Sequence, residues 1–338
     1  MSQFGISDIK EIKKRLLNYL RKEFNNSKMD YDIPPTKLLG GYEALNFQFQ
    51  LKNRQNNFNK RLVLRIYPEY VDPDYVRLVS CVHNVLAKAG FPVAKAHLTS
   101  VDKSILGGAF FIMDFLPGKS LLKLTEPSGI ILNILGKTHA GLHKIDPEPL
   151  IKALNEQRIP ENKYNAESFF KIIEELPKVV PHTRNAVNWV LDNRQSERET
   201  LAICHGDFHA NNILIQDGQV SGILDWHLMI ADPAYDVARS VQVISLFLKV
   251  NTPKPDWPQL EVLKLRYLSE YQSILPLDNR KIIFGRVVYS LLCLMFGASG
   301  QQFMRHPVVV KEQIDLIHEV TGIRIPMPEW VDTTQACT

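Results

Sequence analysis

Residues 203–226 restrict the fold of this chain more than any other part of the sequence. Within this stretch, the pair Asp217-Gly218 separates two apolar runs, residues 213–216 and 219–224. Asp-Gly between apolar runs is the strongest short-range signal for a β-hairpin with a two-residue turn. The stretch therefore predicts a hairpin whose open end carries the polar residues that precede and follow it.

The predicted hairpin brings polar side chains together at its open end. A two-residue turn fixes the register, so Asn212 is expected opposite Ile223, and Asp225 is expected on the same face as Asn212, unless a bulge at Gly222 shifts the pairing. Diagonal neighbours of this kind lie roughly 7–8 Å apart. An amide oxygen and a carboxylate across that gap can share a magnesium ion, which takes one or two such ligands together with substrate phosphates. Asp207, in the loop before the hairpin, would be a free carboxylate beside that metal site.

These residue types suit phosphoryl transfer, in which positioning and charge neutralisation dominate over covalent chemistry. One aspartate accepts the proton of the acceptor hydroxyl, while an amide and a second carboxylate hold the metal. The alternation of His205, Asp207 and His209 also suggests the metal site of a hydrolase. However, the sequence has no His-Glu-x-x-His motif and no second ligand pair nearby, so phosphoryl transfer is the expected chemistry.

The same residues carry a family resemblance. His205-Gly206-Asp207, Asn212 and Leu224-Asp225-Trp226 resemble the catalytic signature of the aminoglycoside phosphotransferase and choline kinase superfamily, whose members share the two-lobed fold of protein kinases. The resemblance implies an α+β fold. A small antiparallel-sheet lobe that binds nucleotide would occupy residues 1–116 and would include an extra N-terminal helix, which hydrophobic spacing predicts over residues 6–24. A larger, mostly helical lobe would occupy residues 117–338.

The resemblance also implies a role for each residue of the signature. Asp207 would be the catalytic base, and His205 would brace the loop. Asn212 and Asp225 would be the magnesium ligands. The later acids Asp232 and Asp236 are expected to anchor the catalytic loop structurally.

The nucleotide, ATP or GTP, is expected to bind to the first lobe. The turn at Gly40-Gly41 would let backbone N–H groups approach its phosphates. Arg65 stands on a predicted strand where protein kinases use a lysine to pair the phosphates. The backbone of Asp114, Phe115 and Leu116 corresponds to the hinge that would hold the purine base.

The predicted helix over residues 74–89 departs from the kinase pattern. Protein kinases place a glutamate on this helix to orient the basic residue of the strand, but Val79 stands at about that position here. No acidic residue occurs between Asp74 and Asp102. Asp72 or Asp74 is therefore the candidate substitute.

Hydrophobic spacing predicts most of the remaining elements. Strands are expected at residues 37–39, 45–51 and 62–67, and a further buried strand within 107–118. Helices are expected at residues 130–143, 167–176, 183–191, 256–271, 280–296 and 308–320, and another begins at Asp232-Pro233. Residues 146–163 are expected to contribute to a substrate cleft. Tyr267, Tyr271, Trp257 and Trp330 either line a cationic pocket or belong to the core, where His143 is also expected.

Composition excludes several classes of protein. The 338 residues carry a net charge of +4, too little for a nucleic-acid partner, and 45% of them are hydrophobic, as in ordinary globular proteins. The longest apolar run, residues 287–296, is too short to span a membrane. The four cysteines, at positions 81, 204, 293 and 337, are scattered and no signal peptide is apparent, so a cytoplasmic protein is expected.

We therefore expect an ATP- or GTP-dependent phosphotransferase. It would transfer the γ-phosphate to a hydroxyl of a small molecule such as an aminoglycoside, a macrolide or an amino alcohol. Two alternatives stay open. The same fold also hosts kinases of protein serine and threonine residues, and the missing helix glutamate would suit a non-catalytic nucleotide-binding protein.

Overall fold

The computed structural model describes residues 8–38, 44–52, 58, 60–124, 128–194, 201–251 and 257–331. The chain forms two compact units. The first, here the sheet unit, comprises Met1–Ser120, Glu148–Ile159 and Ile213–Leu224, and the second, here the helical unit, comprises Leu121–Pro147, Pro160–Asn212 and Asp225–Thr338. The predicted division at residue 116 thus differs from the observed one, because one helix and the hairpin from the later part of the chain join the sheet unit.

The sheet unit is built on five antiparallel strands in the order β1-β2-β3-β5-β4. The strands are β1 (Tyr31–Lys37), β2 (Leu45–Leu51), β3 (Leu62–Ile66), β4 (Ala96–Ser100) and β5 (Phe110–Asp114). The predicted strand over residues 45–51 is confirmed, whereas the first strand ends at Lys37 instead of beginning there. Every residue of β3 is buried, because helices cover both faces of the sheet.

Helix α1 (Ile9–Glu23) covers one of these faces. Its fully buried Ile12, Leu16 and Leu20 recur at helical spacing and join the core formed by alternate residues of β2, β3 and β5. Helix α2 (Pro73–Lys88) packs against β4 and β5, and helix α5 (Glu148–Glu156) packs against α2. Residues 148–156 are therefore a packing element of the sheet unit, and a contribution of residues 146–163 to a substrate cleft stays a prediction.

The predicted hairpin is present, with a register that changes along its length. Strands β8 (Ile213–Gln216) and β9 (Gln219–Ile223) meet at a turn in which Asp217 and Gly218 both have positive φ, as a type I′ turn requires. Near the turn, Ile215 pairs with Val220, as predicted, but beyond a bulge Leu214 pairs with Gly222. The position opposite Ile223 is consequently occupied by Ile213, and the prediction that Asn212 lies there is wrong. Asn212 ends a short 3₁₀ helix (Ala210–Asn212) that precedes the hairpin.

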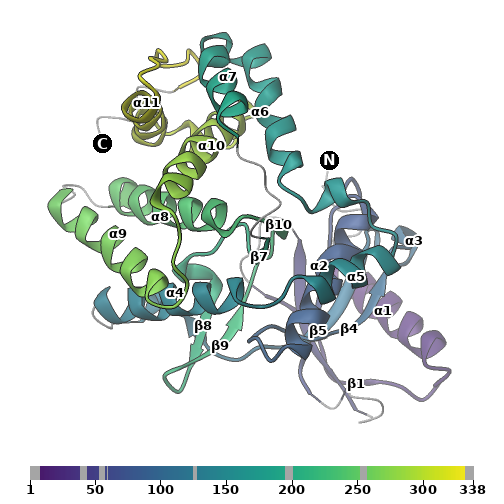
Figure 1. The fold of residues 1–338 in the computed structure, drawn as a ribbon. Helices are drawn as coiled ribbons and strands as arrows, with labels where there is room; N and C mark the ends of the chain where they lie inside the picture. The colour runs from purple at the N-terminus through teal and green to yellow at the C-terminus, as the bar shows by residue number, and fades with distance from the viewer. Residues whose placement is uncertain are drawn as a thin grey trace. The chain divides into compact units, whose positions relative to one another are not determined.

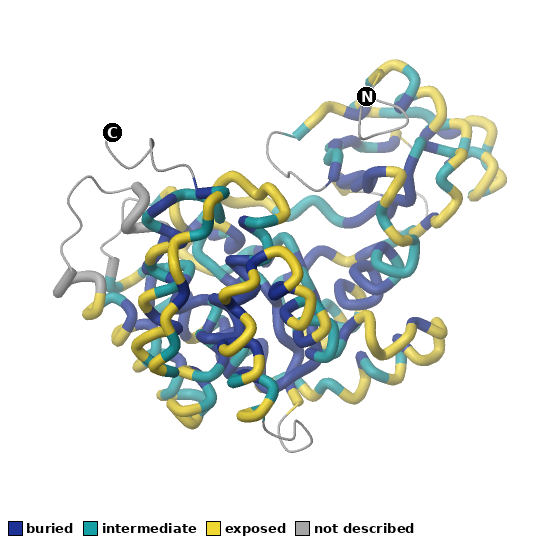
Figure 2. The backbone as a smooth tube through the Cα atoms, turned by 90° about the horizontal axis from the view of Figure 1, so that it is seen from above, coloured by how far each residue is buried: buried dark blue, intermediate teal, exposed yellow. Residues whose placement is uncertain are grey.

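The helical unit is organised around α8 (Pro233–Asn251) and α10 (Asn279–Ala298), which pack against each other (Figure 1). Around them lie α4 (Ser128–His143), α6 (Glu167–Val179), α7 (Arg184–Asp192), α9 (Trp257–Gln272) and α11 (Pro307–Thr321). Two short strands, β7 (Ala202–Cys204) and β10 (Met229–Ala231), pair antiparallel. In Figure 2 the buried backbone runs through the middle of this unit, while exposed residues lie on its outer helices.

Helix α10 is longer than the apolar run that predicted it. By length and composition it could cross a membrane, and it is the one helix of this kind in the described ranges. However, 61% of its most apolar window is buried inside the protein. Its side chains form the centre of the core together with residues of α6, α7 and α11, so α10 is a core helix of this unit.

Candidate active site

The candidate catalytic loop leaves β7 at His205 and ends with the 3₁₀ helix at Asn212. Within it, the Asp207 carboxylate accepts a hydrogen bond from Arg239 Nη2 (2.9 Å) and lies 3.4 Å from His209 Nε2. Burial opposes the ionisation of Asp207, but the hydrogen bond from His209 and the charge of Arg239 outweigh it, so the pKa of this carboxyl lies well below its usual range. Asp207 is therefore ionised and about one quarter exposed.

Asn212 is held against this loop by its own amide groups. Its side-chain nitrogen donates to the backbone oxygen of Asp207 (3.1 Å), and its backbone N–H donates to the oxygen of His209 (2.9 Å). Asn212 is 5% exposed. Because the amide nitrogen faces Asp207, the amide oxygen points to the other side, where it is the atom available to a cation.

Asp225 lies in the segment between β9 and β10, which is hydrogen-bonded to the same loop. The backbone N–H of His227 donates to the oxygen of His205 (2.9 Å), and the β7–β10 pairing continues directly from that contact. A methyl group on Gly206 would lie 2.2 Å from the oxygen of His227, so only glycine permits this approach. Asp225 itself has a φ of +56°, a conformation that aspartate tolerates better than most residues.

His205 is fully buried and acts within the loop. Its Nδ1 accepts the backbone N–H of Asp207 (3.1 Å), and its ring packs against Trp226 and Phe208. The imidazole therefore contacts the loop and Trp226. This geometry supports the bracing role predicted for His205 and does not favour the hydrolase alternative, in which His205 would share a metal with Asp207 and His209.

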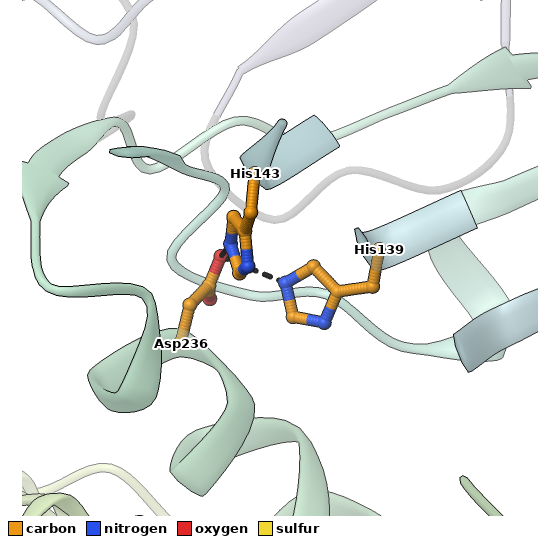
Figure 3. Close-up of side chains that lie close together, drawn as sticks. All are labelled: His139, His143 and Asp236. Carbon is orange, nitrogen blue, oxygen red and sulfur yellow. Dashed lines mark hydrogen bonds and ion pairs between the residues drawn. The ribbon is translucent and has the colours of Figure 1, made fainter. Parts of the chain in front are cut away.

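Asp236 anchors the loop through its carboxylate. One carboxylate oxygen accepts the N–H of His205 (2.5 Å) and the other accepts the N–H of Gly206 (3.0 Å). His139 and His143, both on α4, approach the same carboxylate through Nε2 at 3.0 and 3.3 Å (Figure 3). The prediction that Asp236 is structural agrees with these contacts, and His143 is buried, as expected. His139 was not predicted, although its spacing of four residues from His143 on a helix was the available signal.

Arg65, one of the residues predicted to bind nucleotide phosphates, lies on β3 of the sheet unit. Arg65 is 8% exposed and its guanidinium lies over the ring of Tyr67 (5.3 Å). Of the two predicted substitutes for the missing glutamate, Asp72 caps α2 through the N–H of Asp74, and Asp74 pairs with Arg77. The role of either residue as the partner of Arg65 stays a prediction. Gly40 and Gly41 lie outside the described residues.

The hinge residues follow β5 in the same unit. The N–H of Asp114 donates to Lys95 O and that of Phe115 to Arg61 O, both at 3.0 Å. The carboxylate of Asp114 is engaged by His97 Nε2 (2.7 Å). Of the three predicted residues, Leu116 is the one whose N–H takes part in none of the backbone–backbone bonds of the described chain, so it is the donor available to a base.

The β8–β9 hairpin supports this hinge. Ser221, at the bulge, donates its hydroxyl to Pro117 O (2.5 Å). A methyl group on Gly222 would lie 2.5 Å from a side-chain carbon of Leu116. The bulge therefore fits the hairpin closely against Leu116.

Comparison with known proteins identifies the family. Residues 35–274 match the family model of the Phosphotransferase enzyme family. The chain is 27% identical over 221 residues, 59% of its length, to the "Probable acyl-CoA dehydrogenase IBR3" of Arabidopsis thaliana, and 26% identical over 182 residues to "Acyl-CoA dehydrogenase family member 11" of Gallus gallus. These matches cover 27% and 22% of those proteins, so the chain spans about a quarter of the curated relatives it matches.

Solved structures share the fold. An ethanolamine kinase of Plasmodium vivax matches with a TM-score of 0.58 and 13% identity over 91% of this chain and 86% of that chain. A thermostable aminoglycoside phosphotransferase APH(4)-Ia, in complex with AMP-PNP and hygromycin B, matches with a TM-score of 0.57 and 16% identity over 91% and 99%. The predicted α+β, kinase-like fold is thereby confirmed.

Proposed function

The chain belongs to the Phosphotransferase enzyme family, and on that premise we propose that it transfers the γ-phosphate of ATP or GTP to a hydroxyl of a small molecule. The observation that carries the proposal is the grouping of Asp207, Asn212 and the segment that carries Asp225 around one catalytic loop. In this assignment Asp207 is the base, and Asn212 with Asp225 holds the metal.

The donor set fits magnesium. Asn212 offers an amide oxygen and Asp225 a carboxylate, which are hard oxygen ligands of the kind magnesium prefers, and the remaining positions suit water and phosphate oxygens. When bound, the ion would neutralise the charge of the nucleotide phosphates. Cysteine is unsuited to such a site, and Cys81, Cys204 and Cys293 are all buried.

Asp207 would act directly on the acceptor. Its carboxylate accepts a hydrogen bond from the acceptor hydroxyl and directs the oxygen toward the γ-phosphorus. The new bond forms between that oxygen and phosphorus, the bond to the β-phosphate oxygen breaks, and the nucleoside diphosphate leaves with the electron pair. The hydroxyl proton passes to Asp207. Arg239 and His209 keep this carboxylate ionised before the reaction and fix its orientation.

The sheet unit would supply the nucleotide contacts. Leu116 N–H and the backbone oxygen of Asp114 suit the edge of a purine, and Arg65 suits a phosphate because its guanidinium stays charged when buried. The proposed role of Gly40 and Gly41 in phosphate binding stays a prediction.

The relatives favour a second acceptor class beside antibiotics and amino alcohols. In proteins named acyl-CoA dehydrogenases, a region similar to this chain is part of a much longer polypeptide. Because those proteins are named for acyl-CoA, we also propose a hydroxylated acyl thioester as acceptor. Such an acceptor keeps the same reaction at Asp207 and changes only the group that carries the hydroxyl.

Nucleotide consumption by the purified protein tests the proposal. ATP and GTP with magnesium would be offered with aminoglycosides, macrolides, amino alcohols and hydroxyacyl thioesters, and Asp207→Asn would be the matched control. We expect turnover that one acceptor class stimulates and that falls roughly 10²–10⁴-fold in the control, as for a lost general base. Equal turnover in both proteins would refute the role of Asp207. Phosphorylation of a protein serine or threonine instead would refute the small-molecule acceptor.

A further inference from the structure

Two histidines and two tyrosines form a regular ladder behind the catalytic loop. Helices α4 and α9 lie side by side (Figure 1). His139 and His143, one turn apart on α4, meet Tyr267 and Tyr271, one turn apart on α9. Each histidine Nδ1 lies 2.7 Å from the hydroxyl oxygen of its tyrosine. We refer to these four residues as the His–Tyr ladder.

The ladder ends on the carboxylate that anchors the catalytic loop. Nε2 of both histidines faces the same oxygen of Asp236, and Asp236 also accepts the N–H groups of His205 and Gly206. The side chains of Asp236 and of both histidines are fully buried, and both tyrosines are 0% exposed. A continuous chain of hydrogen bonds therefore leads from α9 through α4 and α8 to the backbone beside Asp207.

The geometry of the ladder favours one arrangement of protons. A carboxylate only accepts, so a neutral imidazole beside it donates from Nε2 and then accepts at Nδ1. The tyrosine hydroxyls are the donors placed at Nδ1. Burial lowers the pKa of His139 to about 4 and raises the pKa of both tyrosines, so the ring is neutral and the hydroxyls keep their protons.

Loss of a tyrosine hydroxyl would remove the hydrogen bond that fixes the position of the imidazole proton. The Nδ1 atom would be left buried without a donor, which is unfavourable. The proton of the imidazole could then move to Nδ1. The unprotonated Nε2 of His139 or His143 would then face the Asp236 carboxylate and repel it. The result would be weaker support for His205 and Gly206.

We infer that Tyr267 and Tyr271 are positioning residues for the catalytic loop, which act by fixing the tautomer of His139 and His143 and so the donors to Asp236. The inference goes beyond the proposed reaction, and its kinetic part rests on it. It also accounts for a cluster whose spacing alone would fit a metal. His139, His143 and Asp236 lie close enough to share a cation, but an Nε2 that donates its proton to Asp236 cannot bind one.

Tyr267→Phe, Tyr271→Phe and the double variant test the inference in the full-length chain. They remove only hydroxyl groups. Tyr31→Phe is the matched control, because the hydroxyl of Tyr31 donates to Lys13 O (2.9 Å) in the sheet unit. Three quantities are compared: the ¹⁵N chemical shifts of the imidazoles of His139 and His143, amide hydrogen exchange at His205 and Gly206, and kcat with the KM for nucleotide.

We expect the wild-type spectrum to show protonated Nε2 and unprotonated Nδ1 at both histidines. In the ladder variants the Nδ1–H tautomer should appear, exchange at His205 and Gly206 should rise about tenfold, and kcat should fall about tenfold with KM unchanged. The control should match wild type in all three. The shifts and the exchange need no turnover, so they test the ladder even if the proposed function fails.

Several results would overturn the inference. An Nδ1–H tautomer in the wild-type protein would do so without any variant, which covers the case of variants that fail to fold. If the amide exchange rates of His205 and Gly206 in the double variant equal those of the wild type, the ladder does not stabilise the loop. One equivalent of zinc in the purified protein, lost in His139→Ala, would make the cluster a metal site.

Discussion

At the scale of single residues, the ionisation of the candidate base Asp207 depends on the cation beside it, Arg239. Arg239 projects from α8, one turn beyond Asp236, and its guanidinium contacts Asp207 and the ring of Tyr289. The sequence signature contains Asp207, but it does not contain Arg239, which is 32 residues away along the chain. An aspartate held so firmly in its ionised form is a weak base. That property suits a reaction in which the acceptor oxygen must be aimed and its proton is needed only late.

Replacement of Arg239 by methionine should separate this role from general packing. The carboxylate of Asp207 would lose its charged partner, so we expect the free energy of unfolding to fall by about 1–3 kcal/mol, less than for a fully buried pair because both side chains are partly exposed. We also expect kcat to fall at least tenfold, because Asp207 is no longer held in place. Arg239→Lys should restore part of both quantities. Denaturant unfolding and steady-state kinetics measure them, and full activity in the methionine variant would contradict the role.

At the scale of elements, the structure of the β8–β9 hairpin depends both on its own turn sequence and on contacts with residues distant in the chain. The Asp217-Gly218 turn forms as its own sequence requires. Beyond it, Ser221 is left out of the pairing, and its hydroxyl bonds to Pro117. Gly222 then fits beneath Leu116. The bulge therefore sets the register at the open end, next to Asn212 and Asp225.

Gly222→Ala should disturb the hinge without unfolding the protein. The added methyl group would displace the flexible side chain of Leu116, and we expect the KM for nucleotide to rise about three- to tenfold, since Leu116 carries the proposed contact to the base. Gly218→Asn is the control, because nothing lies within 4 Å of that position and asparagine suits a type I′ turn. A variant that binds nucleotide as well as the wild type would argue against Leu116 as a base contact.

At the scale of the whole molecule, a buried polar cluster sits inside the helical unit and couples its stability to pH. His139 is fully buried and meets Asp236, His143, Phe208 and Tyr267. Since its pKa in the folded protein is about 4, against 6.5 in the unfolded chain, the unfolded state binds more protons between these two values. The contribution of His139 to stability is therefore complete above pH 6.5 and is lost as the pH falls toward 4.

This coupling predicts a pH-dependent free energy of unfolding. The full shift at His139 corresponds to about 3 kcal/mol, at roughly 1.4 kcal/mol per unit of pKa. Denaturant unfolding at pH 7 and at pH 5 should show a decrease that is smaller in His139→Gln, which has no titrating ring. An equal decrease in both proteins would place the titrating group elsewhere.

The amino-acid sequence determined the parts of this protein that depend on neighbours along the chain. The turn at Asp217-Gly218, the strand over residues 45–51, the helix start at Asp232-Pro233 and the loop from His205 to Asn212 follow from local propensities, capping and spacing. Contacts between distant residues decided the rest. The register at Gly222 depends on Leu116, the ionisation of Asp207 on Arg239, and the anchoring of the loop on His139 and Tyr267. Local chemistry limits each segment to a few conformations, but burial against remote side chains selects among them and sets the charge state of the site.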